Sequence, residues 1–259
     1  MGIERMIRVI PHMVENVWMN LAIDKALLEL MNEDPSQSPV LRTYRLSTPA
    51  IIFCNNQTAA EWDNFTGDAH LARRESAGGG HMYFSEDDIL FSFIAPKSFY
   101  DSTDLHDNYR QANSYMIDAL KSMGIQAHAG KTSIRLGDKL IAGASRIHKK
   151  NAYLHQASLM LDEYNDEIFR HLNAGEDEIE RWNQAVLPLK RLGYSSGKIL
   201  SSIYKHLESH GTSELKEEEM QRAQGYLDKF QEFELKPEGP KESICLITLS
   251  KSKDKDKYL

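Results

Sequence analysis

The sequence predicts a protein of mixed α and β structure, in which a β-rich middle lies between an amphipathic helix and an acidic helical region. Near the N-terminus, apolar residues recur at helical spacing at Val17, Leu21 and Leu28. From residue 40 to residue 162, short apolar or alternating runs are separated by turn residues, which is typical of strands. After Leu161, charged and helix-forming residues dominate.

The same patterns predict the elements in chain order. We expect a strand at 7–10, a helix at 16–31, strands at 40–46, 50–54, 70–76, 81–84 and 89–95, a helix at 106–123, strands at 127–130, 132–136, 139–147 and 152–161, and helices at 196–209 and 213–231. The turn at 47–49 contains Pro49 and suggests that the strands on either side of it form a hairpin. Ser213 and Glu217 resemble a helix start at the last helix.

The composition is that of one main folded unit. The chain has 259 residues, of which 41% are hydrophobic and 27% charged, enough to bury a core. Its apolar runs are far shorter than the roughly 20 residues that span a bilayer, and its charged N-terminus differs from a secretion signal. We expect residues 1–235 to form one domain, β-rich to about residue 165 and helical after it, and residues 236–259 to form a terminal strand and a charged tail.

Charge and cysteine content narrow the classes of protein. The 31 Lys and Arg residues against 38 Asp and Glu give a net charge of −7, which argues against nucleic acid as the main partner. Cys54 and Cys245 lie far apart and outside any CxxC motif, so neither a disulfide framework nor a cysteine-rich zinc site is expected. This usage fits the cytoplasm. Cys54 follows an apolar run and is interpreted as a small buried hydrophobe.

The glycine run Gly78-Gly79-Gly80 is the first candidate for chemistry. Three adjacent glycines between two strands are costly in backbone entropy unless something must approach the main chain closely. Their N–H groups could cradle a phosphate or a carboxylate, with Arg73 and Arg74 supplying charge-assisted bonds. The alternative is a flexible hairpin bend with arginines at the surface.

The second candidate is Lys139, which begins a strand rich in small residues, including Gly143 and Ala144. Such residues would let a ligand lie flat against the sheet while the ammonium group points at the ligand's charged end. The ammonium group of a lysine is a compact point charge, which is suited to hold a carboxylate together with the phosphate that this carboxylate attacks. A solvated lysine after a turn is the alternative.

The third candidate is His155, which lies in a predicted strand. A single strand histidine is more often structural than catalytic. His148 is seven residues away with no carboxylate pattern between them, so no metal site is predicted. Ser145, His155 and Asp162 lack the context of a hydrolase triad.

Taken in order, several segments resemble the lipoate-protein ligase family, in the superfamily that includes biotin-protein ligases and octanoyl transferases. The resemblance covers about residues 1–165 and is weaker to about residue 230. It rests on the helix segment 20–28, on Tyr44-Arg45, on segment 51–57, on the double arginine and triple glycine at 73–80, on segment 138–144 and on segment 155–159.

The resemblance implies an α/β catalytic domain with mixed sheets flanked by helices. It also implies a two-step reaction in which ATP converts lipoate to lipoyl-adenylate, and a lysine of a carrier domain then displaces AMP. Mg²⁺ would be held through the nucleotide phosphates. The implied partner is a lipoyl carrier domain of a dehydrogenase-complex E2 or a glycine-cleavage H-like protein, with neither nucleic acid nor membrane involved.

The resemblance also assigns roles to residues. Lys139 is the implied catalytic residue. The implied substrate-binding residues are Arg45, Arg74, Ser76, Gly78, Gly79, Gly80, Tyr83, Gly143, Ala144 and His155, and the implied nucleotide-binding residues are Arg73, Gly80, Thr132, Ser133 and Lys139.

The sequence differs from the family pattern at three places. Counted back from the triple glycine without a gap, the paired arginines fall on Arg74 and Glu75. The usual His-Asp pair is replaced by Phe84 and Ser85. The Asn-Asp pair ahead of the lysine is replaced by Thr132-Ser133.

Three other functions stay open. A lipoyl or octanoyl transferase would need an acyl-thioester cysteine, but Ala152 occupies the position where the lipoate-synthesis type carries it. A biotin ligase fits less well because its glycine- and arginine-rich biotin loop does not match ESAGGG. Glu75, Phe84 and Ser85 favour a non-catalytic paralogue that binds lipoyl carriers. Because full-size ligases often carry a further C-terminal domain, we also expect a separately encoded accessory domain.

Overall fold

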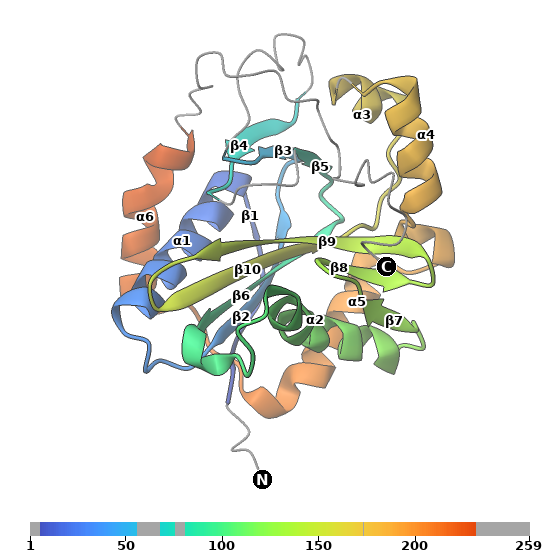
Figure 1. Ribbon diagram of the computed structural model, residues 1–259. Helices are drawn as coiled ribbons and strands as arrows, with labels where there is room; N and C mark the ends of the chain where they lie inside the picture. Colours follow the sequence, from blue (N-terminus) through green and yellow to red (C-terminus); the bar gives the residue numbers. More distant parts are fainter. Residues whose placement is uncertain (1–5, 56–67, 76–80, 173, 232–259) are drawn as a thin grey trace.

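Two mixed β-sheets form the framework of the chain (Figure 1). The computed structural model describes residues 6–55, 68–75, 81–172 and 174–231. The larger sheet has seven strands in the order β1-β2-β6-β10-β9-β8-β7, and the smaller has three in the order β4-β3-β5. The strands are β1 Arg8–Glu15, β2 Val40–Leu46, β3 Ala50–Phe53, β4 His70–Arg73, β5 Met82–Phe84, β6 Ile89–Pro96, β7 Ala127–Ala129, β8 Ser133–Leu136, β9 Lys139–His148 and β10 Ala152–Leu159.

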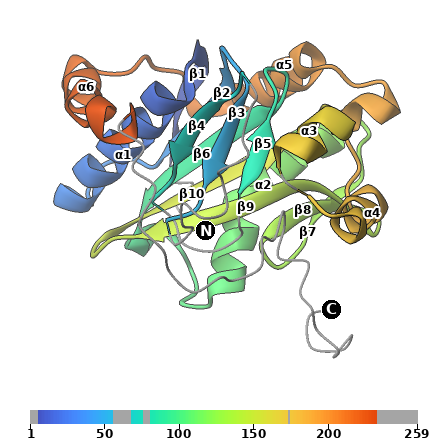
Figure 2. The same cartoon turned by 90° about the horizontal axis from the view of Figure 1, so that it is seen from above.

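Helices cover both faces of the larger sheet. Helices α1 and α6 lie with the smaller sheet on one face, whereas α2 and α5 lie on the other, and Figure 2 shows the same layers from above. The helices are α1 Val17–Glu33, α2 Leu105–Ser122, α3 Asp166–His171, α4 Glu176–Ala185, α5 Ser196–Leu207 and α6 Glu217–Gln231, with short 3-10 helices at Lys97–Phe99, Leu189–Leu192 and Glu208–His210. Among the described residues, no helix combines the length and the apolar character needed to cross a bilayer.

Strand alternation divides the buried side chains of the larger sheet into two cores. On β6, Leu90 and Ile94 face α1 and the smaller sheet, whereas Phe91 and Phe93 face α2 and α5. Both sets are buried, which explains why β6 is apolar on both faces. The mixed α/β fold predicted from the sequence is confirmed by this arrangement.

The predicted hairpin around Pro49 is wrong. Strand β2 pairs in parallel with β1 and antiparallel with β6, while β3 belongs to the smaller sheet, where it pairs with β4 and β5. Both strands are almost wholly buried, so their apolar sequences do not reveal which sheet each one joins. The turn therefore carries the chain from one sheet to the other.

Two termini of elements also differ from the predictions. Strand β1 continues past Pro11 to Glu15, which an edge strand tolerates, and its register is irregular between Ile10 and Met13. Helix α6 begins at Glu217 instead of residue 213, because the Ser213 backbone N–H donates to Val9 and its hydroxyl accepts from Arg8. The predicted tail at 236–259 lies outside the described residues.

A buried ionic network joins α1 to the larger sheet. The carboxylate of Asp24 on α1 accepts hydrogen bonds from Arg42 at 2.6 Å, Ser92 at 2.5 Å and Gln156 at 2.7 Å. These three partners come from β2, β6 and β10, three adjacent strands. Asp24 and Arg42 are almost completely buried, so each depends on the other for compensation of its charge.

We predict that Asp24→Ala lowers the free energy of unfolding by about 3–5 kcal/mol, because it leaves the Arg42 guanidinium buried without its counter-charge. Urea unfolding followed by circular dichroism measures the change. Asp118→Ala is the matched control, because Asp118 on α2 makes an exposed pair with Lys121, and a loss within about 0.5 kcal/mol is expected there. Equal losses in the two variants would contradict this role of Asp24.

Candidate functional site

A cavity of about 210 Å³ lies between the larger and smaller sheets, on the face of the larger sheet that α1 covers. Its walls come from α1, from strands β2, β3, β5, β6, β8, β9 and β10, and from Arg74 after β4 and Thr132 before β8. It is lined by Leu21, Tyr44, Ile52, Arg74, Met82, Phe84, Leu90, Thr132, Ser133, Arg135, Leu140, Gly143, Ala144, Ser145, Gln156, Ala157 and Ser158.

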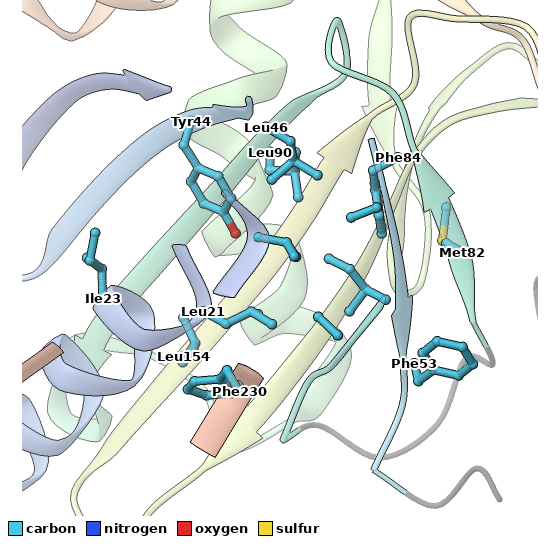
Figure 3. Packing of buried hydrophobic residues seen from close by; sticks show 14 of the residues in the cluster. Leu21, Ile23, Tyr44, Leu46, Phe53, Met82, Phe84, Leu90, Leu154 and Phe230 are labelled. Atoms are coloured by element: carbon cyan, nitrogen blue, oxygen red, sulfur yellow. The ribbon is translucent and has the colours of Figure 1, made fainter. Parts of the chain in front are cut away.

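One part of the lining is apolar. Figure 3 shows Leu21, Tyr44 and Leu90 from α1 and the larger sheet across from Met82 and Phe84 of β5. These five side chains are all buried, and Ile52 of β3 adds a further apolar group. This composition suits a hydrocarbon chain, because burial of apolar surface favours binding.

Another part of the lining carries positive charge and hydroxyl groups. Arg74 and Arg135 supply two guanidinium groups, and Thr132 and Ser133 supply hydroxyls. Burial lowers the pKa of Arg74, but a guanidinium stays charged in proteins. Arg135 donates to the backbone oxygen of Asp138 at 2.6 Å, which holds its side chain across the β8–β9 turn. A cavity that is apolar in one part and cationic in another fits an amphipathic anion.

Strand β9 contributes bare backbone to the cavity. An added Cβ at Gly143 would meet no atom within 4 Å, so a larger side chain there would project into open space at the cavity wall. Ala144 also lines the cavity. The small residues singled out in the sequence therefore do keep space free beside the sheet.

Lys139 lies at the start of β9, next to the cavity-lining Leu140, but is not itself part of the lining. Its ammonium group donates to the backbone oxygen of Gln184 at 2.5 Å, near the C-terminal end of α4. Asp138 lies 3.7 Å away. A helix C-terminus favours a cation, so α4 holds Lys139 in this structure.

Of the other predicted site residues, some lie elsewhere and some lie outside the described residues. Ser76, Gly78, Gly79 and Gly80 are outside them. Arg73 ends β4 opposite Phe53 and is not part of the cavity lining. Arg45 pairs with Asp87 at 3.1 Å, away from the cavity lining.

Tyr83 and His155 also point away from the cavity, because of strand alternation. Met82 and Phe84 line the cavity, so Tyr83 between them lies against the ring of Tyr164, with ring centroids 5.7 Å apart. Gln156 likewise lines the cavity, while the neighbouring His155 faces α2. The structure therefore gathers Arg74, Thr132, Ser133, Gly143 and Ala144, and separates Tyr83 and His155 from them.

His155 belongs to a buried polar cluster on the α2 face. Its Nε2 lies 2.9 Å from Asn113 Oδ1. In the neighbouring strand, the Arg146 guanidinium lies 4.8–5.0 Å from the ring centres of Tyr100, Tyr109 and Tyr153. Burial, and then the charge of Arg146, hold the pKa of His155 well below 6.5, so the imidazole is neutral at pH 7. This environment supports a structural role for His155.

The site residues predicted from the sequence do not include Arg135, Ser145, Gln156 and Ser158, which are polar residues of the lining. A signal for Ser145 was available, because it lies two residues after Gly143 and so shares its face of β9. Gln156 and Arg135 depend on which face of each strand meets the smaller sheet, which the local pattern does not give. Among the described residues, no group of three or more His, Cys, Asp or Glu side chains is arranged to hold a metal ion.

Comparison with known proteins places the chain in a family. The family model of the lipoyl protein ligase A/B catalytic domain matches residues 16–192. The chain belongs to this family. It is 30% identical over 173 residues to lipoate-protein ligase A of Psychrobacter cryohalolentis, a match that covers 64% of this chain and 47% of that protein. The chain thus matches about half the length of this curated relative.

Solved structures share the fold. A lipoate-protein ligase A bound with ATP superposes with a TM-score of 0.71 at 22% identity, covering 88% of this chain and 96% of the other. A structure from the study of a bi-partite lipoate protein ligase and its E2 lipoyl domain from Thermoplasma acidophilum gives a TM-score of 0.73 at 21% identity, covering 90% and 95%. The biotin/lipoate ligase-like fold that the sequence resemblance implied is confirmed.

We predict that acid destabilises the fold through its buried histidines. The pKa of His155 lies well below 6.5 and burial lowers that of His81 to about 4, so below pH 6.5 the unfolded chain binds protons that the folded chain does not. Stability is therefore full above pH 6.5 and falls by about 1.4 kcal/mol per pH unit for each such histidine below it. Urea unfolding of wild type and His155→Gln between pH 7 and pH 5 measures the slopes. A variant slope equal to that of wild type would contradict the contribution of His155.

Proposed function

We propose that the chain is the catalytic part of an ATP-dependent ligase that attaches lipoate to a lysine of a lipoyl carrier domain. The observation that carries the proposal is the cavity itself, which is apolar at Leu21, Ile52 and Met82 and cationic at Arg74 and Arg135. Lipoate has an apolar chain and one carboxylate, so it matches both parts. The names of the relatives support the same activity, since one is a lipoate-protein ligase A and one solved ligase is bound with ATP.

In the first step, an oxygen of the lipoate carboxylate attacks the α-phosphorus of ATP. The bond from this phosphorus to the bridging oxygen breaks, pyrophosphate leaves, and lipoyl-adenylate forms. Lys139 would leave the Gln184 carbonyl and bind the lipoate carboxylate and the α-phosphate of ATP. Its positive charge would stabilise the transition state there. Thr132 and Ser133 would hydrogen-bond the phosphate. Mg²⁺ would enter bound to the other phosphates, as is usual in sites that transfer phosphate groups.

In the second step, the neutral amine of the carrier lysine attacks the carbonyl carbon of lipoyl-adenylate. An amide bond forms, the carbon–oxygen bond to AMP breaks, AMP leaves with the electron pair, and the amine loses one proton to the solvent. We propose that the carrier is an E2 lipoyl domain or an H-like protein. The E2 lipoyl domain studied with the Thermoplasma acidophilum ligase supports the first of these.

The first test of this proposal is the mass of a lipoyl carrier domain after incubation with the purified chain, lipoate and Mg-ATP. We expect a gain of one lipoyl group, and a rate about 10²–10³-fold lower with Lys139→Ala, because an electrostatic stabiliser of the transition state is lost. Lys198→Ala removes an exposed lysine of α5 and is the matched control, with the rate expected to stay at the wild-type level.

Two outcomes would contradict the proposal. If the mass stays unchanged even with an octanoyl carrier as donor and an accessory domain added, the chain is a binding paralogue. If Lys139→Ala and Lys198→Ala retain equal rates, the lysine does not take part in the reaction.

We also propose that full activity requires a separately encoded accessory domain. The bi-partite ligase of Thermoplasma acidophilum supports this arrangement. We expect the chain alone to form lipoyl-adenylate slowly, and the rate of pyrophosphate release to rise when an accessory domain from the same genome is added. Full activity of the single chain would refute the need for such a partner.

A further inference from the structure

Glu75 follows the cavity-lining Arg74 and is held by lysines from two helices. The ammonium group of Lys25 on α1 donates to the two carboxylate oxygens of Glu75 at 2.8 and 3.1 Å. Lys229 on α6 donates to the first of these oxygens at 2.5 Å. We call Glu75, Lys25 and Lys229 the carboxylate clamp.

The clamp is partly shielded from solvent. The side chain of Lys25 is 9% exposed and that of Glu75 is 22% exposed, whereas that of Lys229 is 57% exposed. Burial raises the pKa of Glu75, but the hydrogen bonds from Lys229 and Lys25 outweigh it, so the net pKa is lowered and the group is ionised at neutral pH. Lys25 is also held by Glu29 at 3.3 Å and lies 4.9 Å from the ring centre of Tyr226 on α6. The shielded part of the network is therefore the pair of Lys25 with Glu75, and Lys229 adds an exposed contact to the same carboxylate.

The clamp adjoins the cavity wall. Arg74 is fixed on one side by its backbone N–H, which donates to Phe53 at 2.9 Å, and on the other side by the clamped Glu75. Leu21 and Gln156 line both the main cavity and a small hollow beside Lys25 and Glu75. Phe230, next to Lys229 on α6, also lines that hollow, and Figure 3 shows it beside Leu21 and Leu154.

The two lysines of the clamp also neutralise the negative charge of Glu75 beside Arg74. A carboxylate next to an anion-binding arginine would repel an anionic ligand if its charge were not compensated. The two ammonium groups provide that compensation and fix the residue in place at the same time.

We propose that Glu75 is a positioning residue for substrate binding. In this proposal, which rests on the proposed function, Lys25 and Lys229 hold its carboxylate so that Arg74 presents its guanidinium to the anionic end of the substrate. Helix α6 thereby influences the position of Arg74 through Lys229 and Glu75, although only Arg74 contacts the substrate. Loss of the clamp would displace Arg74 without removing it.

The test compares Lys229→Met with Arg222→Met. Arg222 links α6 to α1 through a 2.6 Å pair with Glu33. Lys229→Met removes an ionic contact of α6 with Glu75, just after β4, whereas Arg222→Met removes an ionic contact of α6 with α1. Each variant takes one ionic contact from α6, and only Lys229→Met breaks the clamp. Glu75→Gln serves as a second variant at the centre of the clamp.

Hydrogen exchange measured by mass spectrometry reports the clamp whether or not the chain is a ligase. We expect the peptide that covers residues 70–75 to exchange faster in Lys229→Met and Glu75→Gln, and at the wild-type rate in Arg222→Met. Steady-state kinetics of carrier lipoylation reports the effect of the clamp on substrate binding. We expect the KM for lipoate or ATP to rise about 5- to 10-fold in the two clamp variants with kcat little changed, and no further rise in the double variant.

Several outcomes would overturn the proposal. If the hydrogen exchange of peptide 70–75 is unchanged in the clamp variants, or if Arg222→Met raises it equally, the clamp merely holds α6 in place and does not position Arg74. If exchange rises but KM does not, Arg74 is not positioned by Glu75. If wild type forms no lipoylated carrier under any condition, the proposed function fails and the substrate role of the clamp fails with it, while the exchange data still report the clamp itself.

Discussion

The buried carboxylate of Asp24 is the interaction on which the rest of the structure depends. It joins α1 to three adjacent strands of the larger sheet through Arg42, Ser92 and Gln156. Hydrogen bonds must compensate the burial of an ion pair this deep, and the two terminal nitrogens of Arg42 also donate to Asn20 on α1. Its buried Nε has no hydrogen-bond partner among the described residues. The position of α1 on the sheet is therefore narrowly defined.

This constraint extends to the candidate site. Gln156 bonds Asp24 and also lines the cavity, and Leu21, one turn before Asp24 on α1, forms part of the apolar wall. The same helix supplies Lys25, which holds Glu75 beside Arg74. Helix α1 thus supplies part of the apolar wall and a lysine that holds the neighbour of Arg74, and the smaller sheet completes the space from the opposite side.

The sequence predicted most elements of the fold because buried strands and amphipathic helices carry strong local patterns. It did not predict the separation of β2 and β3 into two sheets, because both are buried on both faces. For the site, the small residues Gly143 and Ala144 indicated free space beside β9, and they do line the cavity. Tyr83 and His155 point elsewhere because a shift of one residue along a strand reverses the face, and only the tertiary structure decides which face meets the cavity.

The most direct measurement is the structure of the chain with a non-hydrolysable lipoyl-adenylate analogue. We expect the acyl chain to lie between Leu21, Ile52 and Met82, with the phosphate within hydrogen-bond distance of Arg74, Arg135 or Lys139. Lys139 should then have left the Gln184 carbonyl. An analogue bound outside this cavity would contradict the assignment of the cavity as the lipoate site, and one bound inside it while Lys139 still donates to Gln184 would contradict the role of Lys139.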